Sequence, residues 1–513
     1  MRFLMGIALA MAMAAAAPAQ ARWLEASSDN FVIYADDSEK DIARFAQNLE
    51  SYHRAMEILT NSNVVVPSPS NRVVIYVVGD DKDLRDLYGD RSSNVAGFYI
   101  PRAAASRAFV PNLRIYGREP DFSLTVLLHE YAHHFQHITA PKSYTRWLVE
   151  GSAEYYAAAR FLPDGSVEMG NAANHRADEV GYARNVSIRA LLDHETYEKE
   201  NSGNRYDDFY GRSWLLYHYL THHEDRAGQL DRYIRDLASG TPPLKAAENA
   251  FGDFDKLEKD MRSYLGTKYI ANVKLGSDLF EQYDVAVRAV SDGHAEMMPV
   301  IMQSERGVSR EEALSLLPRA REIGARYPGD AAVQAALAEA EFDAGNAQAA
   351  IEAADRAIAA DPENPDAYVQ KGFALFSLAE DIQDPDEQTA AVDAAMIPFS
   401  KLNRIEPDHP LPLIYYYRSF GLKGLSPTEN ARVAIEQAAQ LSPFDNNLWL
   451  TVASLMASEG KIALARDILS PIANNPHEGS AASAASGMIE VLEDKPDGEP
   501  VFLKASVEEE SED

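Results

Sequence analysis

Apolar residues recur with two different periods in the first half of the chain, and this predicts a mixed α and β fold. Residues 30–35 and 71–78 are short apolar runs rich in β-branched side chains, as is typical of strands. Residues 37–60, between these runs, have the spacing of a helix. Residues 121–138 repeat the helical spacing, and a further helix is expected to run through about Phe161.

The order of these elements divides the N-terminal half into parts. Residues 22–116 hold the predicted strands and one helix, so they are expected to form a small α/β lobe. Residues 117–272 are expected to form a mostly helical lobe, and residues 273–294 a linker.

The C-terminal half is rich in Ala and Leu, and proline recurs in it at near-regular intervals. Pro328, Pro362, Pro407, Pro443 and Pro476 are separated by 34, 45, 36 and 33 residues. A period near 34 with proline closing each unit is the pattern of tetratricopeptide repeats. The longer interval predicts one unit with an insertion around residues 380–386. The pattern predicts an all-α solenoid over residues 295–493, with an unrelated helical bundle as the alternative.

Composition and the chain ends indicate where the protein works. Residues 1–21 have one basic residue, an apolar run and an Ala-Gln-Ala end, which predicts a secretory signal peptide cleaved near Ala21. No other segment approaches 18 apolar residues, so no integral membrane segment is expected after cleavage. The chain has no Cys, so no disulfide supports it. A bacterial periplasmic or secreted protein is expected.

Charge excludes one class of partner. The formal net charge is −31, so nucleic acid is not expected to bind, because phosphate recognition needs a basic face. Part of the negative charge lies in residues 494–513, which are expected to form a disordered acidic tail.

A metal-binding motif lies in the predicted helix 121–138. His129 and His133 are four residues apart, so both imidazoles lie on one helical face and can bind one metal ion. Glu130 follows the first histidine and is placed to take a proton from the attacking water. Glu150, separated from His133 by sixteen residues, offers the third ligand that a catalytic zinc requires. The motif predicts a zinc-dependent hydrolase, most simply a peptidase.

Other histidines on this helix are interpreted differently. His134 and His137 are expected to lie on a solvated face, although His137 stands four residues after His133 and is an alternative ligand. A metzincin-type site needs Gly three residues after the second histidine, where Gln136 stands here. That type of site is therefore not expected.

The motif and the segment after it resemble the gluzincin metallopeptidases, most closely the bacterial peptidase MA-like domains. The resemblance covers His129–His133 and the Trp-Leu-x-Glu-Gly-x-Ala-Glu-Tyr segment at residues 147–155. It implies a two-lobed α+β catalytic domain in which His129, His133 and Glu150 bind Zn²⁺ and Glu130 is the general base. It also implies that Glu154 orients a ligating imidazole through the other ring nitrogen.

The resemblance extends to a tyrosine. Residues 206–220 are similar to the helix that carries the transition-state tyrosine of aminopeptidase N-like gluzincins, and Tyr210 takes that position. Tyr206 is the second choice, and a structural role for Tyr210 is the alternative. The aminopeptidases also use an acidic residue on a strand to hold the substrate amine, but residues 95–110 contain no acidic residue. We therefore expect an endopeptidase, with Ala108–Val110 as an edge strand that pairs with substrate.

Two functions follow from these patterns. The first is a zinc endopeptidase whose repeats recruit protein substrates or partners. The second is a non-catalytic scaffold whose metal site is structural or vestigial. Helix pairs in a solenoid contact mainly their neighbours, so the catalytic lobes are expected to fold without the repeats after a cut near Val308.

Overall fold

The fold was taken from a computed structural model. The structure describes residues 23–503 except 94, 105, 114–120, 140–144, 202–205, 281 and 474–478. The predicted signal peptide, residues 1–21, lies outside the described residues. No helix among the described residues is both long and apolar enough to cross a bilayer.

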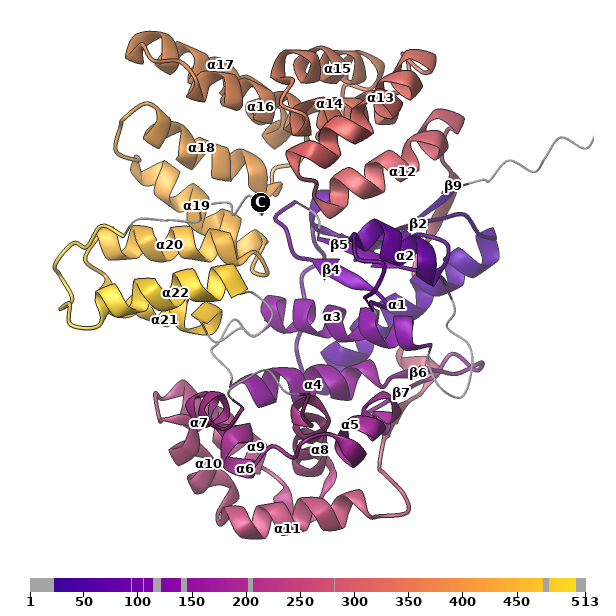
Figure 1. Cartoon of the computed structure of the whole chain (residues 1–513), viewed down its shortest axis with the longest axis vertical. Helices are drawn as coiled ribbons and strands as arrows, with labels where there is room; N and C mark the ends of the chain where they lie inside the picture. Colours follow the sequence, from indigo (N-terminus) through magenta and orange to yellow (C-terminus); the bar gives the residue numbers. More distant parts are fainter. Residues whose placement is uncertain are drawn as a thin grey trace, which may run out of the picture.

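A six-stranded mixed sheet forms the centre of the N-terminal half (Figure 1). Its strand order is β4-β5-β3-β2-β1-β9, and β2, β3 and β5 run parallel to one another. The strands are β1 (Leu24–Ser27), β2 (Phe31–Ala35), β3 (Val73–Val77), β4 (Phe98–Ile100), β5 (Arg107–Val110) and β9 (Ala286–Ala289). A separate small sheet has the order β6-β7-β8, with β6 (Arg160–Phe161), β7 (Val167–Met169) and β8 (Val273–Leu275).

The predicted strands and the long helix between them are present. The predicted runs 30–35 and 71–78 contain β2 and β3, and residues 37–60 contain α1 (Glu39–Thr60). The side chain of Ser38 accepts a hydrogen bond from the backbone N–H of Asp41, so it caps the first turn of α1. Crossover through this helix brings β3 parallel to β2.

Both faces of the sheet are covered. Alternate residues of β3 belong to two different hydrophobic cores. Val73, Ile75 and Val77 point to one face of the sheet and belong to the core that also contains residues of α1 and α3. Val74 and Tyr76 point to the opposite face and pack with the first helices of the C-terminal half. Strands buried on both faces have continuous apolar sequences, as residues 73–78 do.

An aromatic row crosses the second face of the sheet. Tyr34 stacks on Tyr76 at 5.5 Å between ring centroids, Tyr76 on Phe109 at 5.4 Å, and Phe109 on Phe98 at 4.6 Å. The core that contains this row also holds Met297, Met298 and Ile301 of α12 (Asp292–Arg306). Helices of the C-terminal half therefore complete the sheet domain.

The strand at Ala108–Val110 differs from the expectation. β5 lies between β3 and β4, so both of its edges are paired, and its apolar residues are buried. The edge strand on this side is β4. The prediction that Ala108–Val110 pairs with substrate was therefore wrong.

The helices of the candidate site are stacked on the first face of the sheet. Helix α3 (Phe122–Thr139) packs on β4 and β5, α4 (Arg146–Ala157) packs on α3, and α8 (Phe209–His222) packs on α4. The helix expected to reach Phe161 ends at Ala157, because Arg160–Phe161 pairs with β7. Around α4 and α8 lie the other helices of this lobe: α5 (Ala177–Tyr182), α6 (Ile188–Leu192), α7 (His194–Glu200), α9 (Gln229–Ala238), α10 (Pro243–Phe251) and α11 (Phe254–Leu265).

The C-terminal half is an arc of antiparallel helix pairs. In Figure 1 it starts at α12, passes over the sheet and returns with α20 and α22 beside α3. The helices after α12 are α13 (Arg310–Arg326), α14 (Ala331–Asp343), α15 (Ala347–Ala360), α16 (Pro365–Glu380), α17 (Pro385–Ile405), α18 (Pro410–Leu422), α19 (Glu429–Leu441), α20 (Asn446–Ser458), α21 (Ile462–Ala473) and α22 (Gly479–Leu492). The expected insertion falls at the turn between α16 and α17 and in the 21-residue α17.

Two segments predicted to be irregular have defined positions. Residues 273–294 are not a simple linker, because they contain β8 and also β9, which pairs with β1. Residues 494–503 of the predicted disordered tail pack on α20. The N–H of Val501 donates to the Ala457 carbonyl at 2.9 Å, and Leu503 joins the core of the last helices. Residues 504–513 lie outside the described residues.

The helical arc contacts the sheet domain at three places. Near its start, Arg107 of β5 forms a two-point ion pair with Glu305 of α12, at 2.6 and 2.8 Å. In the middle, Glu406 accepts hydrogen bonds from the Ser70 N–H and hydroxyl, at 2.9 and 2.8 Å. Near its end, the ring of Phe444 lies 4.6 Å from that of His134 on α3. The arc is therefore fastened to the domain along its length.

Candidate metal centre

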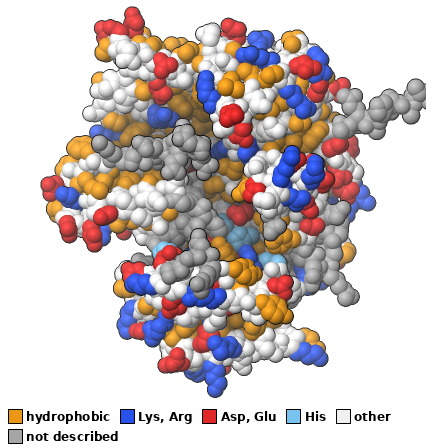
Figure 2. Space-filling view, in the orientation of Figure 1, with side chains coloured by type: hydrophobic (Ala, Val, Ile, Leu, Met, Phe, Trp, Pro, Cys, Tyr) orange, Lys and Arg blue, Asp and Glu red, His pale blue; other side chains and the backbone are white. Residues whose placement is uncertain are grey.

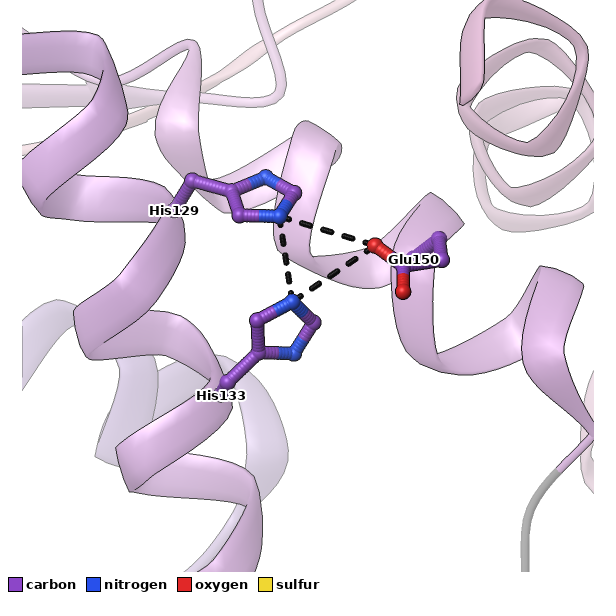
Figure 3. Close-up of side chains that lie close together, drawn as sticks. All are labelled: His129, His133 and Glu150. Carbon is purple, nitrogen blue, oxygen red and sulfur yellow. Dashed lines mark hydrogen bonds and ion pairs between the residues drawn. The ribbon is translucent and has the colours of Figure 1, made fainter. Parts of the chain in front are cut away.

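Two crossing helices bring the three predicted ligands together. His129 and His133 lie one turn apart on α3, and Glu150 lies on α4, which packs against α3. The relative exposure is 8 % for His129, 9 % for His133 and 0 % for Glu150. The Nε2 atoms of the two imidazoles are 3.0 Å apart, and each is 3.5 Å from Oε2 of Glu150 (Figure 3).

This arrangement fits a zinc ion. Tetrahedral zinc with bonds of about 2.0–2.2 Å holds its ligand atoms about 3.4 Å apart, close to the three separations here. The donor set of two imidazoles and one carboxylate is a zinc set that leaves one position for water. Among the described residues, His129, His133 and Glu150 form the cluster of ligating side chains whose donor atoms all lie within 4.8 Å of one another.

Glu130 lies beside the candidate ligands. It follows His129 on α3 and is half-buried, and no described residue forms an ion pair with it. A carboxylate without a fixed counter-charge can accept a proton. Histidine side chains form part of the floor of a hollow between the upper and lower parts of the molecule in Figure 2.

Glu154 supports the first candidate ligand from behind. It is fully buried one turn after Glu150, and its Oε1 lies 3.3 Å from Nδ1 of His129. Its Oε2 lies 2.5 Å from Nε2 of His175, and Oε1 also accepts from Nε of Arg176 at 2.9 Å. A carboxylate at Nδ1 leaves Nε2 of His129 facing Glu150 and His133, as metal ligation requires.

The charges in this cluster shift two pKa values. Burial disfavours a charged His129, but the carboxylates of Glu154 and Glu150 outweigh burial and raise its pKa to about 10. Burial alone would raise the pKa of Glu154. His129, His175 and Arg176 together instead hold the pKa of Glu154 well below its usual value. Glu154 is therefore a carboxylate at neutral pH.

The second candidate ligand has its own support. Nδ1 of His133 lies 3.3 Å from Oε1 of Gln136, and Nε2 of Gln136 donates to the carbonyl of Val149 and the hydroxyl of Ser152. Gln136 therefore connects α3 to α4 and fixes the ring of His133. The sequence carried a signal for this contact, because Gln136 stands three residues after His133 on the same helical face.

Close packing brings Tyr210 to the site. A Cβ at Gly151 would collide with the carbonyl of Ser213, so glycine after Glu150 lets α8 approach the backbone of α4. Tyr210 lies in the first turn of α8. Burial and then the carboxylate of Glu150 raise the pKa of Tyr210 to about 12, so the phenol keeps its proton at neutral pH. Tyr206, the second choice, is 70 % exposed.

Two arginines flank the Tyr210 ring. The guanidinium carbon of Arg176 lies 4.8 Å from the ring centroid, and that of Arg146 lies 5.9 Å from it. Arg176 also donates to Glu179 at 3.2 Å, and Glu179 accepts the N–H of Gly211 next to Tyr210, at 2.8 Å. Two ion pairs and one backbone hydrogen bond therefore connect Glu154, behind His129, with the start of α8. The sequence alone did not single out Arg146, His175 or Arg176.

Of the two remaining histidines of α3, His134 is not on a solvated face, and His137 is half-buried. His134 is buried, and its Nδ1 lies 2.7 Å from the hydroxyl of Tyr99. Burial lowers the pKa of His134 to about 3 and that of His137 to about 4, so both rings are neutral. The solvated-face prediction was wrong for His134, because Phe444 of the helical arc packs against its ring.

Comparisons with known proteins bear on the C-terminal half. The tetratricopeptide repeat family matches residues 331–374, which cover α14, α15 and the start of α16. The repeat prediction is confirmed there. A thermophilic tetratricopeptide repeat protein of Thermus thermophilus is 15 % identical over 39 % of this chain and 99 % of its own, with a TM-score of 0.34. No curated protein matches the chain. Tetratricopeptide repeats serve protein–protein interaction.

Proposed function

We propose that this protein is a zinc-dependent peptidase of gluzincin type whose repeats bind protein substrates or partners. The observation that carries the proposal is the buried His129, His133 and Glu150 set. Its donor atoms lie 3.0 and 3.5 Å apart, with Glu130 next in the chain to the first ligand. The Glu154 carboxylate behind His129 supports the same reading.

Each residue of the site has a task in this proposal. Bound zinc supplies Lewis acidity, which lowers the pKa of water in the site and polarises the scissile carbonyl. Glu130 accepts the proton of the attacking water and passes it to the leaving amine. Tyr210 donates a hydrogen bond to the oxyanion that develops on the carbonyl. Glu154, held by Arg176 and His175, keeps His129 in the ligating orientation.

We favour an endopeptidase that works in the periplasm or after secretion. The predicted signal peptide supports the location, and the lack of any acidic residue over 95–110 disfavours capture of a substrate amine. The second candidate function is a non-catalytic scaffold, which the repeat match at residues 331–374 favours. Hydrolysis of an unfolded protein by zinc-loaded material separates the two, because a scaffold binds such a protein without cutting it.

The first prediction concerns metal content. Protein purified without chelator should hold about one zinc per chain, and His133→Ala should lose it, because two remaining protein ligands retain zinc poorly. Metal analysis by mass spectrometry checks this. His137→Ala is the matched control on the same helix and should keep the metal. Full zinc occupancy in a His133→Ala, Glu150→Ala double variant would contradict the ligand assignment.

The second prediction concerns pH. In the metal-free protein His129 has its pKa raised to about 10, so it holds a proton at neutral pH that zinc must displace. Zinc affinity should therefore rise with pH between 6 and 8, by about tenfold per unit for this one proton. Calorimetric titration in buffers of different ionisation enthalpy counts the protons released. A count of zero at pH 7 would show that His129 is neutral in the metal-free site.

The third prediction concerns the phenol. Tyr210→Phe should lower kcat by roughly 10²–10³ and leave zinc bound, as expected for loss of one oxyanion donor. Steady-state hydrolysis of a short peptide measures the change. Tyr206→Phe removes an exposed hydroxyl nearby in the sequence and should change kcat little. Unchanged turnover in Tyr210→Phe would assign this tyrosine a structural role.

A further inference from the structure

A small pocket adjoins the candidate metal centre on the side of the three-stranded sheet. It encloses about 200 Å³, less than the roughly 300–1,000 Å³ of sites for drug-sized ligands, and suits a single side chain. The pocket is lined by Phe122, Thr125, Ala158, Arg160, Ala172, Asn174 and His175.

Two lining residues connect the pocket to the site. Thr125 lies one turn before His129 on α3, so the pocket begins on the face of the helix that carries the ligands. His175 contacts the same Glu154 carboxylate that supports His129, at 2.5 Å. One carboxylate therefore separates the pocket wall from a candidate ligand.

The charge of the pocket comes from Arg160, the first residue of β6. Its side chain is partly buried, and its Nε atom is fully buried with no hydrogen-bond partner. Glu168 stands opposite it on β7, yet no ion pair joins Arg160 to this or any other described residue. The described lining of the pocket contains no acidic side chain.

The other arginine near the pocket is paired. Arg176 donates to both Glu154 and Glu179, so its charge is balanced within the protein. Arg160 is only half-buried, but its Nε atom is buried without a hydrogen-bond partner, and a carboxylate in the pocket would supply both that partner and a counter-charge.

We propose that this pocket is a substrate subsite for a carboxylate, held by Arg160. The inference rests on the proposed peptidase function and names its substrate class: peptides with a carboxylate near the scissile bond. A guanidinium binds a carboxylate through two parallel hydrogen bonds. The half-exposed ring of Phe122 and the methyl groups of Ala158 and Ala172 flank the aliphatic part of an acidic side chain. The carboxylate comes from a Glu or Asp side chain or from the C-terminus of the peptide.

Matched peptides test the subsite through hydrolysis. In the first set, Glu or Gln stands in turn at each position around one scissile bond, and the C-terminus is amidated. In the second set, the side chains are uncharged and the C-terminus is a free carboxylate. The protein should prefer a carboxylate at one position, and the two sets show which source it uses. Arg160→Gln should raise KM for the preferred peptide about 10- to 100-fold, the loss expected for a hydrogen bond to a charged group. Its KM for the Gln peptide should rise less than its KM for the Glu peptide, because the Gln side chain has no charge for Arg160 to bind.

Two further variants control for charge and folding. Arg232→Gln removes a positive charge from the exposed surface of α9, away from β6 in Figure 1, and should not change the preference. Arg160→Lys keeps the charge without the paired donors and should retain part of the preference. Zinc content that matches the unaltered protein shows that the Arg160 variants are folded.

A binding measurement separates this inference from the proposed function. Fluorescence anisotropy with the Glu130→Gln protein should show at least tenfold tighter binding of the preferred Glu peptide than of its Gln partner. This difference should vanish when Arg160→Gln is added. A carboxylate preference in binding without any hydrolysis would overturn the peptidase and leave the subsite standing. Equal binding of the two peptides, or a preference that survives Arg160→Gln, would overturn the subsite.

Discussion

Glu130→Gln should lower kcat by about 10²–10⁴ while the protein keeps its zinc and its fold, because an amide cannot accept the proton of the attacking water. The substitution preserves the shape of a half-buried side chain that forms no ion pair with a described residue. It should therefore leave the free energy of unfolding nearly unchanged. Hydrolysis of a short unstructured peptide, metal analysis and thermal unfolding on the same preparation measure the three quantities.

Glu154→Gln is the informative comparison. Both substitutions replace a carboxylate with an amide, but the Glu154 carboxylate has charged partners in His129, His175 and Arg176. Glu154→Gln should therefore weaken zinc binding and lower the melting temperature. Equal hydrolysis by Glu130→Gln and the unaltered protein would remove Glu130 from the mechanism. Loss of zinc from Glu130→Gln would show that this glutamate supports the metal instead.

The second large effect concerns the repeats. A chain that ends at Val308 should fail to give soluble, folded protein, contrary to the expectation from the repeat pattern. The cut leaves α12 on the aromatic face of the sheet and removes the helices that cover α12. It exposes a core to which Leu317, Ile323, Val333 and Leu337 contribute. At about 1.5–3 kcal/mol per large side chain, their loss costs about 6–12 kcal/mol, the scale of the whole stability of a domain.

A second cut provides the matched control. A chain that ends at Asp361 keeps α12 to α15, and with them the helices of the core that covers the aromatic face. The cut removes Ala367 and exposes its small partners Ala335 and Ala357, which bury little area. This shorter protein should be soluble and bind zinc. Soluble protein with a normal unfolding transition after the cut at Val308 would show that the sheet domain and α12 are stable without the helices that pack on α12. Yield, circular dichroism and zinc content distinguish the two cuts.

The sequence predicted the local elements well and their assembly less well. β2, β3, α1 and α3 follow directly from apolar periods of two and of 3.6 residues. The contact between repeats and sheet was missed, although residues 73–78 are apolar at every position, which indicates a strand buried on both faces. The place of β5 inside the sheet depends on pairing with β3 and β4, which its four-residue sequence does not specify.

For the candidate site, the helical motif predicted what lies close in the chain. His129 and His133 share a face by their spacing, and the helix containing Glu150 meets that face in the structure. His175 and Arg176 were not predicted, because more than twenty residues separate them from Glu154 and no helical spacing connects them. Arg160 was not predicted either. Its lack of a counter-charge depends on which residues of α3 and of the three-stranded sheet lie around it in the fold, and the sequence does not specify these neighbours.

Zinc-dependent hydrolysis of an unfolded protein tests the central claim most directly. Metal-free protein is titrated with zinc while the cleavage of casein is followed, with Glu130→Gln titrated in parallel. We predict that cleavage rises with zinc and levels off at about one zinc per chain, and that Glu130→Gln binds the same amount of zinc without cleaving. Full zinc binding with no cleavage of casein or of short peptides would contradict the peptidase and favour the scaffold.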